Sequence, residues 1–216
     1  MNSWKYENLF YLTSDKKRIL KLLDHYEVYK KILKVRGDIV ECGVFKGASL
    51  IRFLTFRDLI EKKNKRKVIG FDAFGKFPHP KKEHKNNKVD KIFAKRHDDN
   101  IGLGININLL KSYLKKKKIT NYHLVKGDVL KTLPFFLKKN KNLKISLLHL
   151  DLDVYAPTKF VLENLYKNIS KNGIILLDDY THIQGATLAV DEFINKYNLK
   201  VKRVSKFGRP YFIQKK

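Results

Sequence analysis

The sequence predicts a doubly wound α/β fold, in which a mostly parallel sheet carries helices on both faces. Two observations support this prediction. First, short apolar runs of strand length alternate along the chain with longer segments whose apolar residues recur at helical spacing. Second, several of the apolar runs end abruptly in glycine or aspartate, which is typical of strands whose carboxyl ends face a ligand.

The elements are expected in a regular order. Residues 1–36 should form a helical N-terminal extension, with Ser14 as a cap candidate for one or two helices up to Lys34. Strands are expected at Asp38–Cys42, Lys67–Phe71, Tyr122–Val125, Ile145–Leu150 and Gly173–Leu177. Helices are expected at Leu50–Glu61, Ile105–Leu114, Val129–Leu137, from Val154 through Ile169 with Pro157 and Thr158 at its start, and in the second half of residues 178–197.

The C-terminal end of the chain contains two further strand candidates. Val201–Val204 and Tyr211–Ile213 lie on either side of Gly208 and Pro210, an arrangement that suggests a closing hairpin.

Residues 73–104 show no convincing periodicity and contain Gly75, Pro78 and Pro80. A loop of this length within a compact domain is usually functional, and we interpret it as a lid on the ligand side of the sheet. Its basic residues could meet an anionic substrate, although each could also be a solvated charge. They are Lys76, Lys81, Lys82, Arg96 and His97. Asp98 and Asp99 fall in this irregular segment and are not counted as ligands.

Composition favours one globular domain spanning residues 1–216, because 43% of the residues are hydrophobic. The net charge of +26 suggests a polyanionic partner, but the lysine runs at 62–67, 115–118 and 138–144 each precede a predicted strand. We therefore expect them at the edge opposite the acidic residues, where a bias towards lysine in solvated loops explains much of the excess. No segment resembles a membrane span or a signal peptide, so we expect a cytoplasmic protein.

Four aspartates define the predicted active site. Asp151 and Asp153 follow one strand, and Asp178 and Asp179 follow the next. Because the carboxyl ends of parallel strands meet at one edge, the four side chains should share a small site. Crowded carboxylates repel, and a divalent cation removes the conflict; oxygen ligands suit Mg²⁺. The alternative is that they cap helices or are solvated.

A cofactor site is expected beside these acids. Gly43 and Gly47 separate the first strand from a helix whose amino end offers unpaired N–H groups. The patterns GxGxxG and GxxxxGK[ST] are absent, which counts against NAD and against a P-loop. Asp72 ends the second strand, where it could accept both ribose hydroxyls of a nucleoside. Asp128 could accept from an adenine amino group or cap the next helix. The lone Cys42 is more easily understood as a core residue than as a nucleophile.

These motifs resemble the macrocin O-methyltransferase (TylF-type) family of class I, S-adenosylmethionine-dependent methyltransferases. The resemblance extends from Gly37 to Phe193 and rests on VECGVFKGAS, VIGFDAFGKFP, VKGDVLKTLP, HLDLDVYAPT and LLDDY with GATLAVDEF. It implies a Rossmann-like sheet of about seven strands with the last one antiparallel, and Mg²⁺-assisted methylation of a sugar hydroxyl.

The resemblance also assigns roles to residues. Asp151, Asp178 and Asp179 would be the metal ligands, and Asp153 the general base. Independently of the resemblance, His182 and His149 are rival bases, although His149 alternates out of its strand and is more easily understood as a packed residue. The contacts to the cofactor would come from the glycine turn and the strand ends: Glu41, Cys42, Gly43, Gly47, Ser49, Asp72, Ala73, Asp128 and Asp151.

The acceptor is expected to be a sugar, and an anionic one if the basic lid holds phosphate. A nucleotide sugar, a surface-polysaccharide sugar or a natural-product sugar would each fit. The alternatives are an RNA or other nucleic-acid methyltransferase that uses the basic surface, and a binding module without catalysis. We expect a homo-oligomer, although the residues do not specify the number of subunits.

Overall fold

A single mixed sheet forms the centre of the protein in the computed structural model, which describes residues 3–61, 66–80, 87–206 and 210–216. Within these ranges the sheet has seven strands in the order β3-β2-β1-β4-β5-β7-β6. The first five are mutually parallel, and β7 lies antiparallel between β5 and β6. The strands are β1 Asp38–Cys42, β2 Val68–Asp72, β3 Tyr122–Lys126, β4 Ile145–Leu150, β5 Ile169–Leu177, β6 Val201–Arg203 and β7 Tyr211–Gln214.

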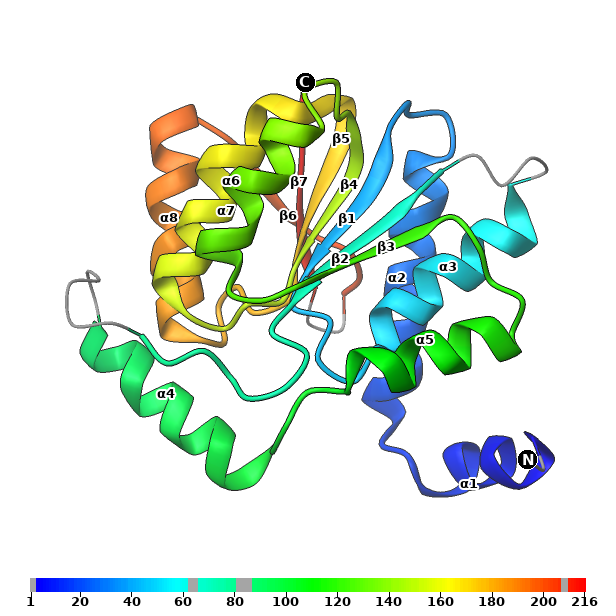
Figure 1. The fold of residues 1–216 in the computed structure, drawn as a ribbon. Coiled ribbons are helices and arrows are strands. Elements are labelled where there is room, and N and C mark those ends of the chain that lie inside the picture. The colour runs from blue at the N-terminus through cyan, green and yellow to red at the C-terminus, as the bar shows by residue number, and fades with distance from the viewer. Residues whose placement is uncertain (1–2, 62–65, 81–86, 207–209) are drawn as a thin grey trace.

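Helices cover both faces of this sheet (Figure 1). One face carries α2 Lys16–Ile32, α3 Ala48–Ile60 and α5 Ile107–Lys116, and the other carries α6 Val129–Lys139, α7 Tyr155–Leu165 and α8 Gln184–Tyr197. A short 3₁₀ helix, Tyr166–Asn168, joins α7 to β5. Two further helices, α1 Ser3–Thr13 and α4 Asn87–Asn100, lie towards the end of the sheet where β1, β2 and β4 finish (Figure 1). The predicted doubly wound fold is confirmed.

Each strand divides its side chains between two hydrophobic cores, because successive residues point to opposite faces of a sheet. In β1, Ile39 packs with the cluster under α2 and α3, whereas Val40 packs with the cluster under α6, α7 and α8. In β4, Leu147 and Leu148 divide in the same way. Burial on both faces explains why the central strands are continuous apolar runs.

The five predicted parallel strands are confirmed, and so is the pairing of the two C-terminal segments, since β6 and β7 pair antiparallel. Gly208, in the segment between them, lies outside the described residues. The helix expected to continue through Ile169 ends earlier, at Leu165, and β5 begins at Ile169. Ser14 is not the cap of α2; that cap is Asp15, whose carboxylate accepts the backbone N–H of Lys17.

The prediction that residues 73–104 lack regular structure is wrong for part of that segment, because Asn87–Asn100 forms α4. Asp90, Ala94 and His97 are buried on one face of this helix. They have helical spacing, but two of them are polar, so the segment shows no apolar periodicity. The correction also applies to Asp98 and Asp99, which belong to a helix and not to an irregular loop.

The lysine runs at 115–118 and 138–144 directly precede β3 and β4. They therefore lie at the edge of the sheet opposite the strand ends that carry the acids. Residues 62–65 of the third run are outside the described ranges. At the same edge the buried guanidinium of Arg57 donates to the carbonyls of Arg66, Thr120 and Asn121 and so connects the segments that precede β2 and β3. Within the described ranges, no helix combines the length and the apolar character needed to cross a membrane.

Candidate active site at the carboxyl ends of the strands

A cavity of about 300 Å³ opens at the carboxyl ends of β1 to β4. Its lining includes Gly43 after β1, Asp72 at the end of β2, Asp128 after β3, and Asp151 and Asp153 after β4. The chain reverses its direction of winding between β1 and β4, and ligands of doubly wound sheets bind at such a switch point. The cavity therefore lies where the fold predicts a ligand.

Asp72 and Asp128 are held by backbone donors at one end of this cavity. The carboxylate of Asp72 accepts the N–H of Phe45 at 2.8 Å and that of Phe74 at 2.6 Å. Asp128 is the N-cap of α6 and accepts the N–H of Leu130 at 2.9 Å. Asp128 thus has the capping role considered from the sequence, whereas Asp72 holds loop N–H groups, and both line the cavity together with Ala73.

Glu41 is fully buried in the middle of β1, on the face covered by α2 and α3. Its Oε1 atom accepts a hydrogen bond from the Ser49 hydroxyl and lies 3.2 Å from Nδ1 of His149, whereas Oε2 has no partner among the described residues. Cys42 points to the opposite face, where burial, followed by the charge of Glu41, raises the pKa of its thiol. The Cys42 side chain is therefore part of the core.

The glycine turn brings the β1 and β4 loops together. Gly43 has a φ of +96°, and a Cβ atom placed on it would lie 1.7 Å from the Asp151 carbonyl oxygen. The backbone N–H of Asp151 donates to the Cys42 carbonyl at 2.9 Å. Gly47, at a φ of +85°, is the N-cap of α3 and lies against Leu110. Only glycine fits position 43 without moving the acidic loop.

Three of the four predicted acids converge on one point. Asp151, Asp153 and Asp179 each place a carboxylate oxygen within 4.8 Å of the others. Asp153 adopts a φ of +64°, and its N–H donates to the Asp179 carboxylate at 3.0 Å. Asp178 turns instead towards His25 and His149 and forms a second group with them. The structure thus brings together aspartates from two distant segments, with Asp153 in the place where we had expected Asp178.

The electrostatics of the first group favour a bound cation. Burial, followed by the charges of Asp178 and Asp179, raises the pKa of Asp151 well above its ordinary value. Burial, followed by the charges of Asp153 and Asp178, does the same to the pKa of Asp179. The pKa of Asp153 rises to about 8, through burial and then the charges of Asp151 and Asp178. A cation among these oxygens would offset the repulsion that keeps protons on them.

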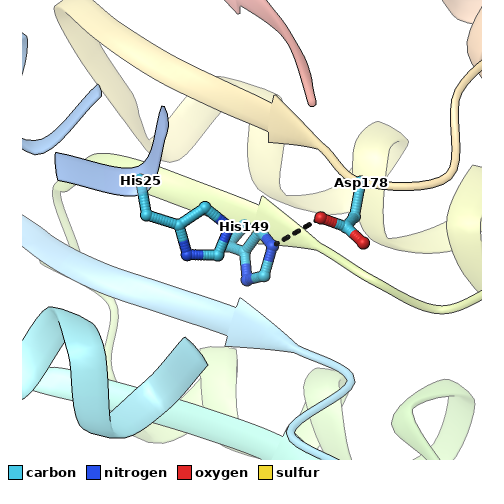
Figure 2. Close-up of side chains that lie close together, drawn as sticks. All are labelled: His25, His149 and Asp178. Atoms are coloured by element: carbon cyan, nitrogen blue, oxygen red, sulfur yellow. Dashed lines mark ion pairs between the residues drawn. The ribbon is translucent and has the colours of Figure 1, made fainter. Parts of the chain in front are cut away.

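Cationic groups surround the fourth acid. The Nζ atom of Lys21 on α2 lies 2.6 Å from the Asp178 carboxylate and 3.9 Å from that of Asp151. Nε2 of His149 lies 3.9 Å from Asp178, an ion pair when the ring is protonated (Figure 2). Burial opposes that charge, but the carboxylates of Asp178 and Glu41 outweigh it and raise the pKa of His149 to about 10. His25 packs beside His149, and burial keeps its pKa well below the usual value.

The segment interpreted as a lid is docked against the acidic loop. The carboxylate of Asp90 on α4 is buried and accepts the backbone N–H of Tyr155, the first residue of α7, at 2.9 and 3.0 Å. Gly185 on α8 leaves room for it, because a Cβ atom there would lie 2.2 Å from Asp90. His97 of α4 packs on Phe77 at 4.6 Å between ring centres, and both line the cavity.

Some predicted residues lie elsewhere. His182, a rival base, is exposed and does not belong to the cavity lining. Arg96 is exposed, Lys76 lines the cavity, and Lys81 and Lys82 lie outside the described residues. Sequence reasoning missed Lys21 and Asp90. Lys21 lies three residues after Arg18 and four before His25 on one face of α2, but so many lysines are present in this chain that the spacing did not single it out.

The strand order, the single antiparallel strand β7 and the cavity at the switch point define a class I methyltransferase fold. A family model for macrocin-O-methyltransferase (TylF) matches residues 12–208. Because that match covers most of the sequence, the chain belongs to the TylF macrocin O-methyltransferase family.

Individual relatives agree with this assignment. An 8-demethyl-8-(2,3-dimethoxy-alpha-L-rhamnosyl)-tetracenomycin-C 4'-O-methyltransferase of Streptomyces olivaceus is 27% identical over 169 residues, which cover 76% of this chain and 60% of the relative. This chain thus spans less than two thirds of that protein. The calicheamicin methyltransferase CalS11 superposes with a TM-score of 0.78 at 24% identity, over 99% of this chain and 86% of CalS11.

An apo structure of CalS11, described as a TDP-rhamnose 3'-O-methyltransferase, gives a TM-score of 0.71 at 25% identity over the same shares of the two chains. Both relatives are thus described as methyltransferases of rhamnose-containing compounds.

Proposed function

We propose that this protein is an S-adenosylmethionine-dependent, Mg²⁺-assisted O-methyltransferase that acts on a sugar hydroxyl. The observation that carries the proposal is the convergence of the Asp151, Asp153 and Asp179 carboxylates beside the cavity. Membership of the TylF family supports it, and so do the names of relatives that methylate rhamnose-containing compounds. The sugar belongs to one of three acceptor classes: a nucleotide sugar, a natural product or a surface polysaccharide.

The residues present fit a divalent cation. Asp151, Asp153 and Asp179 offer carboxylate oxygens, the donors that Mg²⁺ prefers, and burial together with neighbouring carboxylate charges raises their pKa values. A bound Mg²⁺ would supply Lewis acidity, which makes a nearby hydroxyl more acidic. We assign Asp151 and Asp179 as direct ligands of the metal. Asp178 lies beside them, because the Lys21 ammonium that contacts its carboxylate also approaches Asp151.

The residues present also fit the methyl donor. Asp72 and Asp128 both line the cavity, and oxygen lone pairs remain on both carboxylates. Asp72 would accept from the two ribose hydroxyls, and Asp128 from the adenine amino group. Oε2 of Glu41 is buried without a partner, which suits a cationic or N–H group of a ligand. S-adenosylmethionine would supply a methyl group activated by its sulfonium.

Asp153 is our choice for the general base. Asp153 lines the cavity, and its backbone is fixed by the hydrogen bond to the Asp179 carboxylate, so its own carboxylate stands beside the space in which the sugar hydroxyl would react. In this role Asp153 accepts the proton of the sugar hydroxyl at a carboxylate oxygen. The lid residues Phe77 and His97 would exclude water from the reacting groups.

Two measurements test this proposal. Calorimetry should detect S-adenosylmethionine binding to the wild-type protein, and methyl transfer to a panel that includes TDP-rhamnose and rhamnosylated acceptors should stop in excess chelator. Asp153→Asn should lower kcat by roughly 10²- to 10⁴-fold, the usual contribution of a general base. Asp99→Asn, which removes an exposed carboxylate from α4, is the matched control and should retain full activity. Absence of donor binding, or an unaffected Asp153→Asn variant, would contradict the assignment.

The net charge of +26 keeps a nucleic-acid substrate as a second candidate. RNA binding with a log K that falls steeply with log salt, together with methyl transfer to RNA, would favour it over the sugar.

A further inference from the structure

Two arginines beside the acidic site form no ion pair within the described part of the chain. Arg18 on α2 lines the cavity, and Arg52 on α3 is half-buried. Among the described residues, the guanidinium of neither one forms a hydrogen bond or an ion pair. Elsewhere in this chain buried arginines are fully engaged, as Arg57 is by three carbonyls and Asp58. A half-buried arginine without a partner therefore indicates a missing ligand.

The fold directs both arginines towards the same region. Arg18, Lys21 and His25 lie at positions i, i+3 and i+7 of α2 and so share one helix face. That face meets the acids, because Lys21 contacts Asp178 at 2.6 Å. It also meets α3, because the His25 ring stacks on Phe53, the neighbour of Arg52, at 5.1 Å between centres. Arg18 thus lines the cavity from α2, and Arg52 lies on the neighbouring helix α3, within range of the charges of Arg18, Asp178 and Glu41.

The charges of the two arginines act on each other. Burial, followed by the positive charge of Arg18, lowers the pKa of Arg52, against the opposing influence of Asp178 and Glu41. The nearby carboxylates do not neutralise the pair, since Asp178 is already engaged by Lys21 and His149. An oxyanion placed between the two guanidiniums would remove the repulsion and accept several N–H donors at once.

We propose that Arg18 and Arg52 bind a phosphoryl group of the acceptor, and that the acceptor is therefore a nucleoside diphosphate sugar. This inference rests on the proposed function and narrows its substrate class. A diphosphate carries about two negative charges, which match two guanidiniums. The carboxylate of the methyl donor is the competing oxyanion, and loss of donor binding in the arginine variants is the result that would assign the pair to it instead. An uncharged glycoside of a natural product would leave both arginines unpaired.

The test is calorimetry of thymidine diphosphate and of inorganic pyrophosphate, in chelator, with wild type, Arg18→Ala and Arg52→Ala. Each substitution should weaken binding of both probes by roughly 10- to 150-fold, the value of one or more hydrogen bonds to a charged group. The matched control is Arg36→Ala, which removes an exposed arginine just before β1, at the opposite edge of the sheet. It should change either affinity by less than about twofold, because only screened charge is lost.

A folding defect can be separated from a binding defect. The Arg52 guanidinium has no hydrogen-bond or ion-pair partner among the described residues, so Arg52→Gln should leave Tm unchanged or raise it. The same variant should still bind thymidine diphosphate more weakly than the wild type. The inference is overturned if wild type binds neither probe at millimolar concentration, or if the arginine variants lose S-adenosylmethionine and keep thymidine diphosphate. Donor binding without diphosphate binding would refute this inference alone, whereas loss of donor binding by the wild-type protein would refute the proposed function.

Discussion

Substitution of Gly43 by alanine tests whether the glycine turn holds the acidic loop in place. The new Cβ atom would lie 1.7 Å from the Asp151 carbonyl oxygen, whereas real Cβ contacts essentially never fall below 3.0 Å, so one loop must retreat by at least about 1.3 Å. An L-residue at this positive φ costs about 1–2 kcal/mol. Loss of the hydrogen bond from Asp151 to Cys42 adds about 0.5–1.5 kcal/mol.

A destabilisation of about 2–3 kcal/mol should lower Tm by roughly 5–10 °C in a protein of this size. The measurement is calorimetric unfolding of the wild type, Gly43→Ala and the control Gly75→Ala, at which a Cβ atom meets nothing within 4 Å. The control should unfold at the wild-type temperature or up to about 4 °C above it, because its backbone can accept alanine and gains up to about 1 kcal/mol. If Gly43→Ala also unfolds at the wild-type temperature, the two loops are not coupled through this contact.

Two more substitutions test other parts of the structure. Arg57→Met should cost about 2–5 kcal/mol in urea unfolding, because it leaves the carbonyls of Arg66 and Thr120 without their donor, whereas the Asn121 carbonyl keeps the N–H of Val68; an unchanged midpoint would refute this role. Burial, followed by the charges of Lys67 and Lys111, lowers the pKa of His123, so the native ring stays neutral while the unfolded ring gains a proton near pH 6.5. The contribution of the neutral His123 ring to the free energy of unfolding is therefore present above that pH and is lost as pH falls through the native pKa. His123→Gln should reduce the loss of stability to urea between pH 7 and pH 5. Parallel pH profiles of the variant and the wild type would contradict this.

The acids were predictable from the sequence because they follow apolar strands. Asp151 and Asp179 are 28 residues apart in the chain, yet parallel pairing of β4 with β5 fixes both at one edge of the sheet. The register also accounts for what was not predictable. Asp153 turns towards Asp179 only because its backbone adopts a positive φ, which no local pattern encodes for an aspartate. The antiparallel direction of the last strand came from the family resemblance and not from periodicity, and its place between β5 and β6 was not predicted.

The cations of the site depend on tertiary packing and could not be predicted. Lys21 has the same surroundings in sequence as many other lysines, and only the docking of α2 over β4 and β5 brings it to Asp178. His149 was recognised as a residue packed within the strand, but its charge depends on Glu41 and Asp178, which come from two other strands. The helix α4 was missed because a polar residue, Asp90, occupies its buried face.

The contact between Asp90 and Tyr155 also links movement of α4 to the order of α7. If α4 withdrew, the first N–H of α7 would exchange a charged acceptor for water, at a cost of about 1.5–3 kcal/mol. That cost shifts the equilibrium between withdrawn and docked α4 towards the docked state by roughly 10- to 160-fold in the absence of ligand. Withdrawal of α4 would thus loosen the helix start that follows Asp153, the residue proposed as the general base.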